Sequence, residues 1–226
     1  MSNQEPWTQV ARNVLRAGFF KSPLTPTIEQ LLQTIISEEE AEFLQIFDKA
    51  TLNLDQIRER VDLDENALDE RLEGLMDKGI LMGLPSRSTG IMVYRLLPLF
   101  PGIFEISFMK GENTEKERRL SKLFDQVFEE MIPGAQENYK RTVKTYKRLP
   151  AFDRVIPVEE EIDMDVEEIL PVERVEELVK KHDIIGVSTC YCKHEKDLLD
   201  ESCKMSDERD HCLYFGRFAE FLIDHD

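Results

Sequence analysis

The fold of the first half is decided by residues 64–82, which read DENALDERLEGLMDKGILM. Apolar residues recur every three or four positions, so the pattern predicts an amphipathic helix that begins at Asp64. These apolar residues are Leu68, Leu72, Leu75 and Met76. Gly79 is placed to end the helix in a left-handed conformation, and residues 80–82 then predict a strand.

Two further helix starts precede this stretch. Ser37 with Glu40, and Asn53 with Gln56, have the spacing of reciprocal capping boxes. A second strand is expected at residues 91–96, after the turn-rich segment 85–90. Three helices followed by a hairpin is the order of a winged helix-turn-helix, in which the third helix takes the recognition position.

The charge pattern disfavours nucleic acid as a partner. The chain holds 46 acidic and 29 basic side chains, a net charge of −17, whereas affinity for nucleic acid comes largely from Lys and Arg. The third helix is itself acidic, with Asp69, Glu73 and Asp77 on its polar face. This surface serves solubility or orients the protein towards a basic protein partner.

The middle of the chain predicts helices at 116–131 and from Pro133-Gly134 to about Arg148. The second helix carries a basic patch, which we interpret as a solvated face. Its members are Lys140, Arg141, Lys144, Lys147 and Arg148. The most apolar stretch, 96–109, is interrupted and too short to span a membrane, and no secretory signal is visible. We therefore expect a cytoplasmic protein with reduced thiols.

The last part predicts strands at 154–158 and 183–188 and helices at 172–181 and 213–223, with an acidic linker at 159–168. We expect a mostly helical α+β fold in three parts. These are a winged-helix-like domain at 1–110, a helical connection at 111–150 and a cysteine-rich metal-binding region at 151–226. A homo-oligomer is compatible with this organisation.

All four cysteines lie in that last region, at Cys190, Cys192, Cys203 and Cys212. Four thiolates can hold one [4Fe–4S] cluster or a tetrahedral zinc ion, and their spacing does not decide between the two. If the backbone stays extended, Cys190 and Cys192 point to the same side. Cys212 is expected at the start of the last helix, where the helix dipole favours a thiolate. Buried free thiols or a redox-switching disulfide pair are the alternatives.

Three histidines lie near these cysteines, at His182, His194 and His211. Each could replace a cysteine as a ligand in a Cys3His zinc site. His194 and His211 lie closest to a cysteine in the sequence, so we expect them to hydrogen-bond around the site rather than to bind the metal.

Two segments resemble ferredoxin-domain proteins of anaerobic bacteria and archaea that carry a degenerate winged-helix region. One runs from Ile184-Ile185-Gly186-Val187 through Cys190-Tyr191-Cys192-Lys193-His194 to Cys212-Leu213-Tyr214-Phe215-Gly216, and the other is Pro101-Gly102-Ile103-Phe104-Glu105. The resemblance covers roughly residues 28–224. It implies iron–sulfur binding and electron transfer, with the four cysteines as ligands.

This chain departs from the family in two ways. Lys193 stands where the family usually has Arg, and the C-x2-C-x2-C-x3-C-P segments are absent. We therefore expect one cluster and a protein redox partner, and no enzyme activity, because no catalytic constellation is visible. The alternative function is a zinc-binding winged-helix regulator or scaffold protein.

Overall fold

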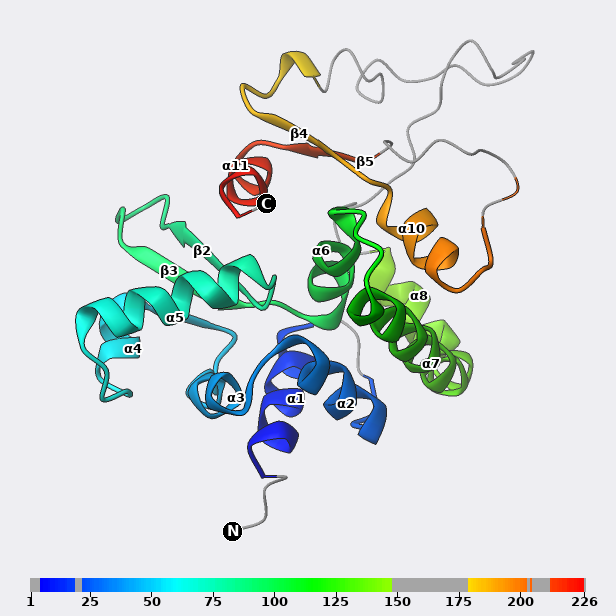
Figure 1. The fold of residues 1–226 in the computed structure, drawn as a ribbon, viewed down its shortest axis with the longest axis horizontal. Coiled ribbons are helices and arrows are strands. Elements are labelled where there is room, and N and C mark those ends of the chain that lie inside the picture. The colour runs from blue at the N-terminus through cyan, green and yellow to red at the C-terminus, as the bar shows by residue number, and fades with distance from the viewer. Residues whose placement is uncertain (1–4, 19–21, 148–178, 203, 205–211, 226) are drawn as a thin grey trace.

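The computed structural model describes residues 5–18, 22–147, 179–202, 204 and 212–225. Its fold is α+β and mostly helical, as the sequence predicted, and it contains two small antiparallel sheets (Figure 1). Outside the described residues lie the expected strand at 154–158, the acidic linker, nearly all of the helix at 172–181, and Arg148, Cys203 and His211. No helix in the described part combines the length and apolar character that crossing a bilayer requires.

The first sheet has the strand order β1-β3-β2, from β1 (Thr51–Asn53), β2 (Leu81–Pro85) and β3 (Met92–Leu96). Tyr94 lies at its centre and pairs with Leu52 on one side and Gly83 on the other. The hairpin β2–β3 matches the predicted one within a few residues. The sequence did not predict β1, which pairs with β3 and buries Leu52 in the core.

Helices α3 (Glu38–Leu44), α4 (Leu54–Arg58) and α5 (Glu65–Asp77) begin where the sequence predicted. Both capping boxes are present, and the Asp64 side chain accepts a hydrogen bond from the Ala67 N–H at 2.9 Å. Gly79 has φ +65°, and a Cβ there would lie 2.4 Å from the Cγ2 of Ile106. Both the backbone conformation and this close approach therefore favour glycine at this position.

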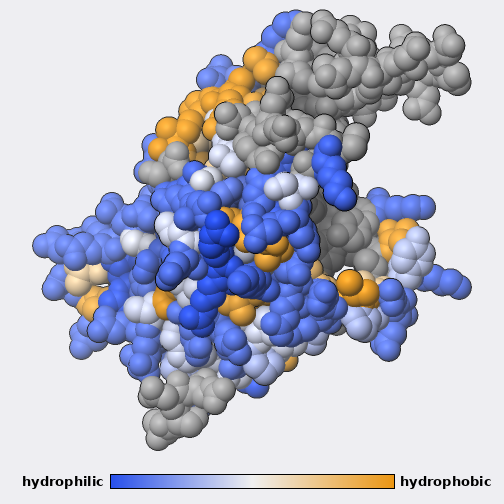
Figure 2. Space-filling view, turned by 45° about the vertical axis from the view of Figure 1, so that its right-hand side comes forward, coloured by the Kyte–Doolittle hydropathy of each residue, from blue (hydrophilic) through white to orange (hydrophobic). Residues whose placement is uncertain are grey.

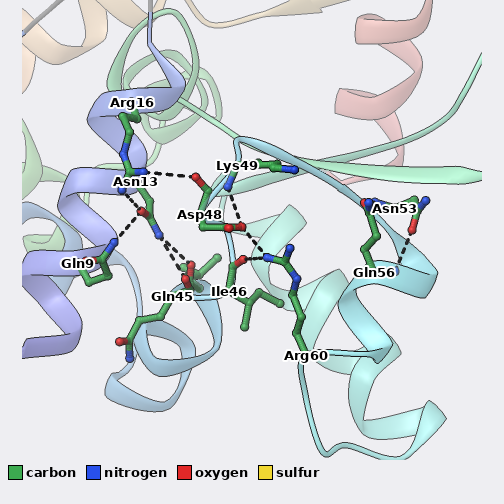
Figure 3. A network of polar contacts seen from close by, with 11 residues as sticks. Gln9, Asn13, Arg16, Gln45, Ile46, Asp48, Lys49, Asn53, Gln56 and Arg60 are labelled. Atoms are coloured by element: carbon green, nitrogen blue, oxygen red, sulfur yellow. Dashed lines mark hydrogen bonds and ion pairs between the residues drawn. The ribbon is translucent and has the colours of Figure 1, made fainter.

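Polar side chains tie α1 (Glu5–Ala17) to the end of α3 (Figure 3). Asn13 is 2% exposed, and its Nδ2 lies 3.5 Å from the carbonyl oxygens of Leu44 and Gln45. Arg60 donates to the Ile46 carbonyl at 2.6 Å. These donors satisfy carbonyl groups that the end of a helix leaves without partners.

One ion pair fixes α3 against the end of α5. Lys78 Nζ lies 2.6 and 2.7 Å from the two carboxylate oxygens of Glu40. Burial would raise the pKa of Glu40, but hydrogen bonds from Lys78 and Ser37 outweigh it and the pKa is lowered. The carboxylate that closes the capping box therefore stays charged.

The predicted helix break at Pro133 is wrong, because α7 (Glu115–Glu137) continues through it. Pro133 is exposed, so water can satisfy the carbonyl group that a proline leaves unpaired. The chain turns instead at Asn138, before α8 (Tyr139–Tyr146). Lys140, Arg141 and Lys144 are exposed on α8.

The core brings α6 and α7, in the middle of the chain, together with helices from its N-terminal and C-terminal parts. Phe104 is the first residue of α6 (Phe104–Met109), which follows the irregular segment Leu99–Ile103. The centroid of its ring lies 5.0 Å from that of Phe124 on α7 and 5.7 Å from that of Tyr191. Helix α2 (Pro26–Ile35) packs on α7, where Thr27 Oγ1 donates to Glu130 at 2.6 Å. Helices α6, α7 and α10 (Tyr191–Leu198) pack against one another (Figure 1).

The second sheet is a two-stranded ribbon of β4 (Ile185–Ser188) and β5 (Cys212–Phe215). Helix α11 (Arg217–Asp224) covers one side of it and reaches the first sheet, where Arg217 donates to the Pro85 carbonyl. Val187 and Leu213 point to the other side and are 64% and 37% exposed. The face of the molecule drawn in Figure 2 is mostly hydrophilic, with scattered hydrophobic patches.

Candidate metal centre

The three described cysteines lie where β4, α10 and β5 meet. Cys190 immediately precedes α10, Cys192 lies in its first turn, and Cys212 is the first residue of β5. None of the three forms a disulfide. The fourth predicted ligand, Cys203, lies outside the described residues.

The expectation that Cys190 and Cys192 share one side of an extended segment is wrong. The extended backbone ends at Cys190 (φ −64°, ψ 102°), and α10 begins at Tyr191. The residues of α10 that are buried against the core follow a helical spacing: Tyr191, His194, Glu195 and Leu198. This spacing of three or four residues is visible in the sequence, and a helix places all four side chains on one face. Cys192 is consequently exposed.

The expectation that Cys212 starts the last helix is also wrong. Residues 212–215 pair with β4, and α11 begins only after Gly216, which has φ +63°. The N-terminus that Cys212 does meet belongs to α10, because the Tyr191 backbone N–H hydrogen-bonds to the Cys212 sulfur. A peptide N–H at a helix start favours a thiolate at that position.

Pairing of the ribbon brings Cys190 and Cys212 together. Cys212 lies opposite Ser188, and Ser188 is two residues before Cys190. The thiols of Cys190 and Cys212 are in hydrogen-bond contact. Burial, and then the neighbouring charge of Cys190, raise the pKa of Cys212 to about 12. A bound cation would reverse this effect, because it stabilises the thiolate.

The described residues alone do not supply a complete ligand set. Among them, no three His, Cys, Asp or Glu side chains are grouped closely enough to hold a metal ion. The site is thus a contacting pair, Cys190 and Cys212, with Cys192 near enough to raise the pKa of Cys212 further. Thiol sulfur is the donor type that zinc and iron–sulfur clusters select, so the chemistry of the pair fits either group.

The loop between α6 and α7 forms one wall of the site. Gly111 has φ +70°, and a Cβ there would lie 2.7 Å from Thr189 Oγ1, just before Cys190. His194 is 8% exposed, and its Nε2 donates to the Glu112 carbonyl at 2.7 Å. His194 therefore holds α10 to this loop. The ring of His182 contacts that of Phe215 of β5, with the ring centroids 5.2 Å apart.

Two residues near the thiols, Ser188 and Tyr214, were not predicted from the sequence to belong to the site. Tyr214 hydrogen-bonds to the Cys212 side chain, and its hydroxyl lies 3.5 Å from Ser188 Oγ. Burial, and the nearby Cys212 and Glu105, raise the pKa of Tyr214. The signal that could have found Tyr214 is its position two residues beyond Cys212, which in a strand is the same face.

Comparison with known proteins supplies no relative: no family model, no curated protein and no solved structure matches this chain.

Proposed function

We propose that this chain is an iron–sulfur protein in which Cys190, Cys192, Cys203 and Cys212 hold one [4Fe–4S] cluster. The observation that supports this most directly is the contact between the Cys190 thiol, at the start of α10, and the Cys212 thiol, on β5. Two neighbouring thiolates repel each other, and a bound metal ion or cluster offsets this repulsion because it stabilises both thiolates. When bound, the cluster supplies one-electron chemistry.

The surroundings of the pair suit a negatively charged group. The Tyr191 N–H donates to the Cys212 sulfur at the start of α10, where the positive end of the helix lies. The site lies beside the exposed Cys192 and not deep in the core. An accessible position favours electron exchange with a protein redox partner over chemistry on a small substrate, so the proposed role is electron relay or redox-dependent protein contact and not catalysis.

The first part of the chain is proposed to be a winged-helix module that contacts protein. Its elements follow the order α3-β1-α4-α5-β2-β3, with the hairpin β2–β3 in the position of a wing. Asp69, Glu73 and Asp77 of α5 are exposed, and they would repel phosphates at each contact. The acidic α5 face therefore supports a protein partner and opposes nucleic acid.

Purification without oxygen tests the proposal. The expected product is brown, absorbs broadly at roughly 400 nm and contains about four irons and four sulfides per chain. Cys190→Ser and Cys212→Ser should each lose most of the iron. Ser202→Ala, a change at an exposed position next to Cys203, is the matched control and should retain it. Full iron content in both cysteine variants would overturn the ligand assignment.

The second candidate is a zinc-binding regulator or scaffold protein, favoured by the element order of the first part. It predicts a colourless protein with about one zinc, whose cysteine region unfolds when a chelator is added. A protein that binds neither iron nor zinc under these conditions would overturn both proposals.

A further inference from the structure

The side of the β4–β5 ribbon that faces α11 carries a row of polar side chains. Ser188 and Cys212 are direct partners across the two strands, and Tyr214 follows Cys212 on the same face. Side chains at such positions lie within contact distance of one another. Ser188, Cys212 and Tyr214 therefore form one group beside the Cys190 thiol.

The protons of the two hydroxyl groups can be assigned. Ser188 Oγ lies 3.1 Å from the Thr189 carbonyl oxygen and 3.5 Å from Tyr214 Oη. A carbonyl oxygen only accepts, and a serine has one proton to give. Ser188 is the donor to Tyr214 Oη, so Tyr214 accepts this bond and its own proton is left for the Cys212 sulfur, with which Tyr214 is in hydrogen-bond contact.

We propose that Tyr214 is a positioning residue of the thiolate site, whose hydroxyl donates a hydrogen bond to the Cys212 sulfur when that sulfur binds a metal or cluster. This inference rests on the proposed function. Hydrogen bonds to ligand sulfurs withdraw negative charge from them, and so favour the reduced form of a bound cluster. Tyr214 thus sets the reduction potential without being a ligand.

Two features make the hydroxyl suited to this role. A tyrosine hydroxyl ordinarily loses its proton only at about pH 10, so the group remains a donor at neutral pH. The second donor to the same sulfur is the backbone N–H of Tyr191, which no side-chain substitution removes. Losing the Tyr214 hydroxyl should therefore weaken the effect on Cys212 without abolishing it.

Cobalt is a suitable probe because it binds thiolates whether the natural group is zinc or a cluster. Metal-free, reduced protein is titrated with Co²⁺ without oxygen, and the sulfur-to-cobalt charge-transfer bands are recorded. A hydrogen bond lowers the energy of the sulfur electrons, so its loss in Tyr214→Phe should move the bands to lower energy. Tyr139→Phe, at a 67% exposed position, is the matched control and should leave them unchanged.

Ser188→Ala identifies the donor. Its bands should stay at or above the wild-type energy, because Tyr214 keeps its proton. If Ser188→Ala reproduces the shift of Tyr214→Phe, Ser188 is the donor and the assignment is wrong. Circular dichroism of each variant checks that the fold is retained.

A reconstituted cluster gives a second, independent readout. In Tyr214→Phe the equilibrium constant of reduction should fall by about three- to tenfold, where tenfold is about 59 mV for a one-electron couple. Wild-type protein that shows neither thiolate–cobalt bands nor a cluster would overturn the proposed function together with this inference. Bands present in wild type and unchanged in Tyr214→Phe would overturn this inference alone.

Discussion

Two regions of this molecule are built in different ways. From α3 to β3, each helix begins at a side-chain cap only three residues from its partner, at Ser37, Asn53 and Asp64. From β4 to α11, neither helix has a side-chain cap at its first position. The first region is specified by local sequence, and the second by contacts with distant parts of the chain.

Those distant contacts surround the thiols. His194 of α10 bonds to Glu112, and at the far end of α11 the His225 ring lies 2.8 Å from the Asp77 carboxylate. Together with the ribbon pairing they hold Cys190 and Cys212 in place. The geometry of the candidate metal centre should therefore respond to changes elsewhere in the core, whereas the first region should respond mainly to its own caps.

The largest effect is expected from Phe104→Ala, which removes the ring that packs α10 of the second region against α6 and α7. Phe104 is 8% exposed and contacts both Phe124 and Tyr191. Truncating a buried Phe costs about 3–5 kcal/mol. Trp7, the single tryptophan, lies on α1, which packs against α3 and so reports on the first region. We expect denaturant to expose Cys212 to a thiol reagent before the fluorescence of Trp7 changes.

Phe43→Ala is the matched control, since Phe43 is 7% exposed and its ring pairs with Phe47, within the first region. It should lower the free energy of unfolding without this selective exposure. If the Cys212 and Trp7 signals coincide in both variants, the two regions unfold as one unit and the contrast between them fails.

A smaller effect is expected from the pH dependence of Glu195 in the second region. Glu195 is 2% exposed, and its Oε1 makes no hydrogen bond. Burial raises its pKa to about 7 from 4.5, against the opposing charge of Lys196. The protonated form is therefore favoured in the folded state. The contribution of Glu195 to the free energy of unfolding is fully present below about pH 4.5. It is lost as the pH rises to about 7, which lowers the free energy of unfolding by up to about 3 kcal/mol.

Glu195→Gln should remove this loss, so that its free energy of unfolding changes less than that of wild type between pH 5 and 8. Glu201→Gln is the matched control, because the Glu201 side chain is 66% exposed beside the same Lys196. It should keep most of the wild-type pH dependence, because burial raises the pKa of Glu195 more than the charge of Glu201 does. Identical profiles for wild type and Glu195→Gln would contradict the assignment.

How far the sequence could predict the structure follows the same division. The caps at Ser37, Asn53 and Asp64 are short-range signals, and the helices begin there. Strand β1 gives no signal of its own, because its residues take extended form by pairing with β3. The passage of α7 through Pro133 depends on solvent exposure, which the sequence does not state.

The candidate site shows the same limit. The sequence singled out the cysteines by their clustering, but it placed Cys212 at the start of a helix because Phe215, Phe218, Phe221 and Leu222 fit a helical stripe. Pairing with β4 overrides that stripe at residues 212–215. Tyr214 shares a face with Cys212 because this pairing makes the segment a strand, so the two-residue spacing between them becomes informative only when the strand is recognised.

The smallest effect is expected from Asn53→Ala, which tests the first region alone. The Asn53 side chain accepts a hydrogen bond from Gln56 N–H at 2.8 Å, and Gln56 Oε1 accepts one from Asn53 N–H at 3.0 Å. Losing such a cap costs about 1 kcal/mol. Asn66→Ala, at an exposed position within α5, is the matched control and should be neutral or slightly stabilising. The thiol reactivity of Cys212 should be unchanged in both variants, because the cap acts only on α4. Increased reactivity in Asn53→Ala would show that local capping also supports the second region.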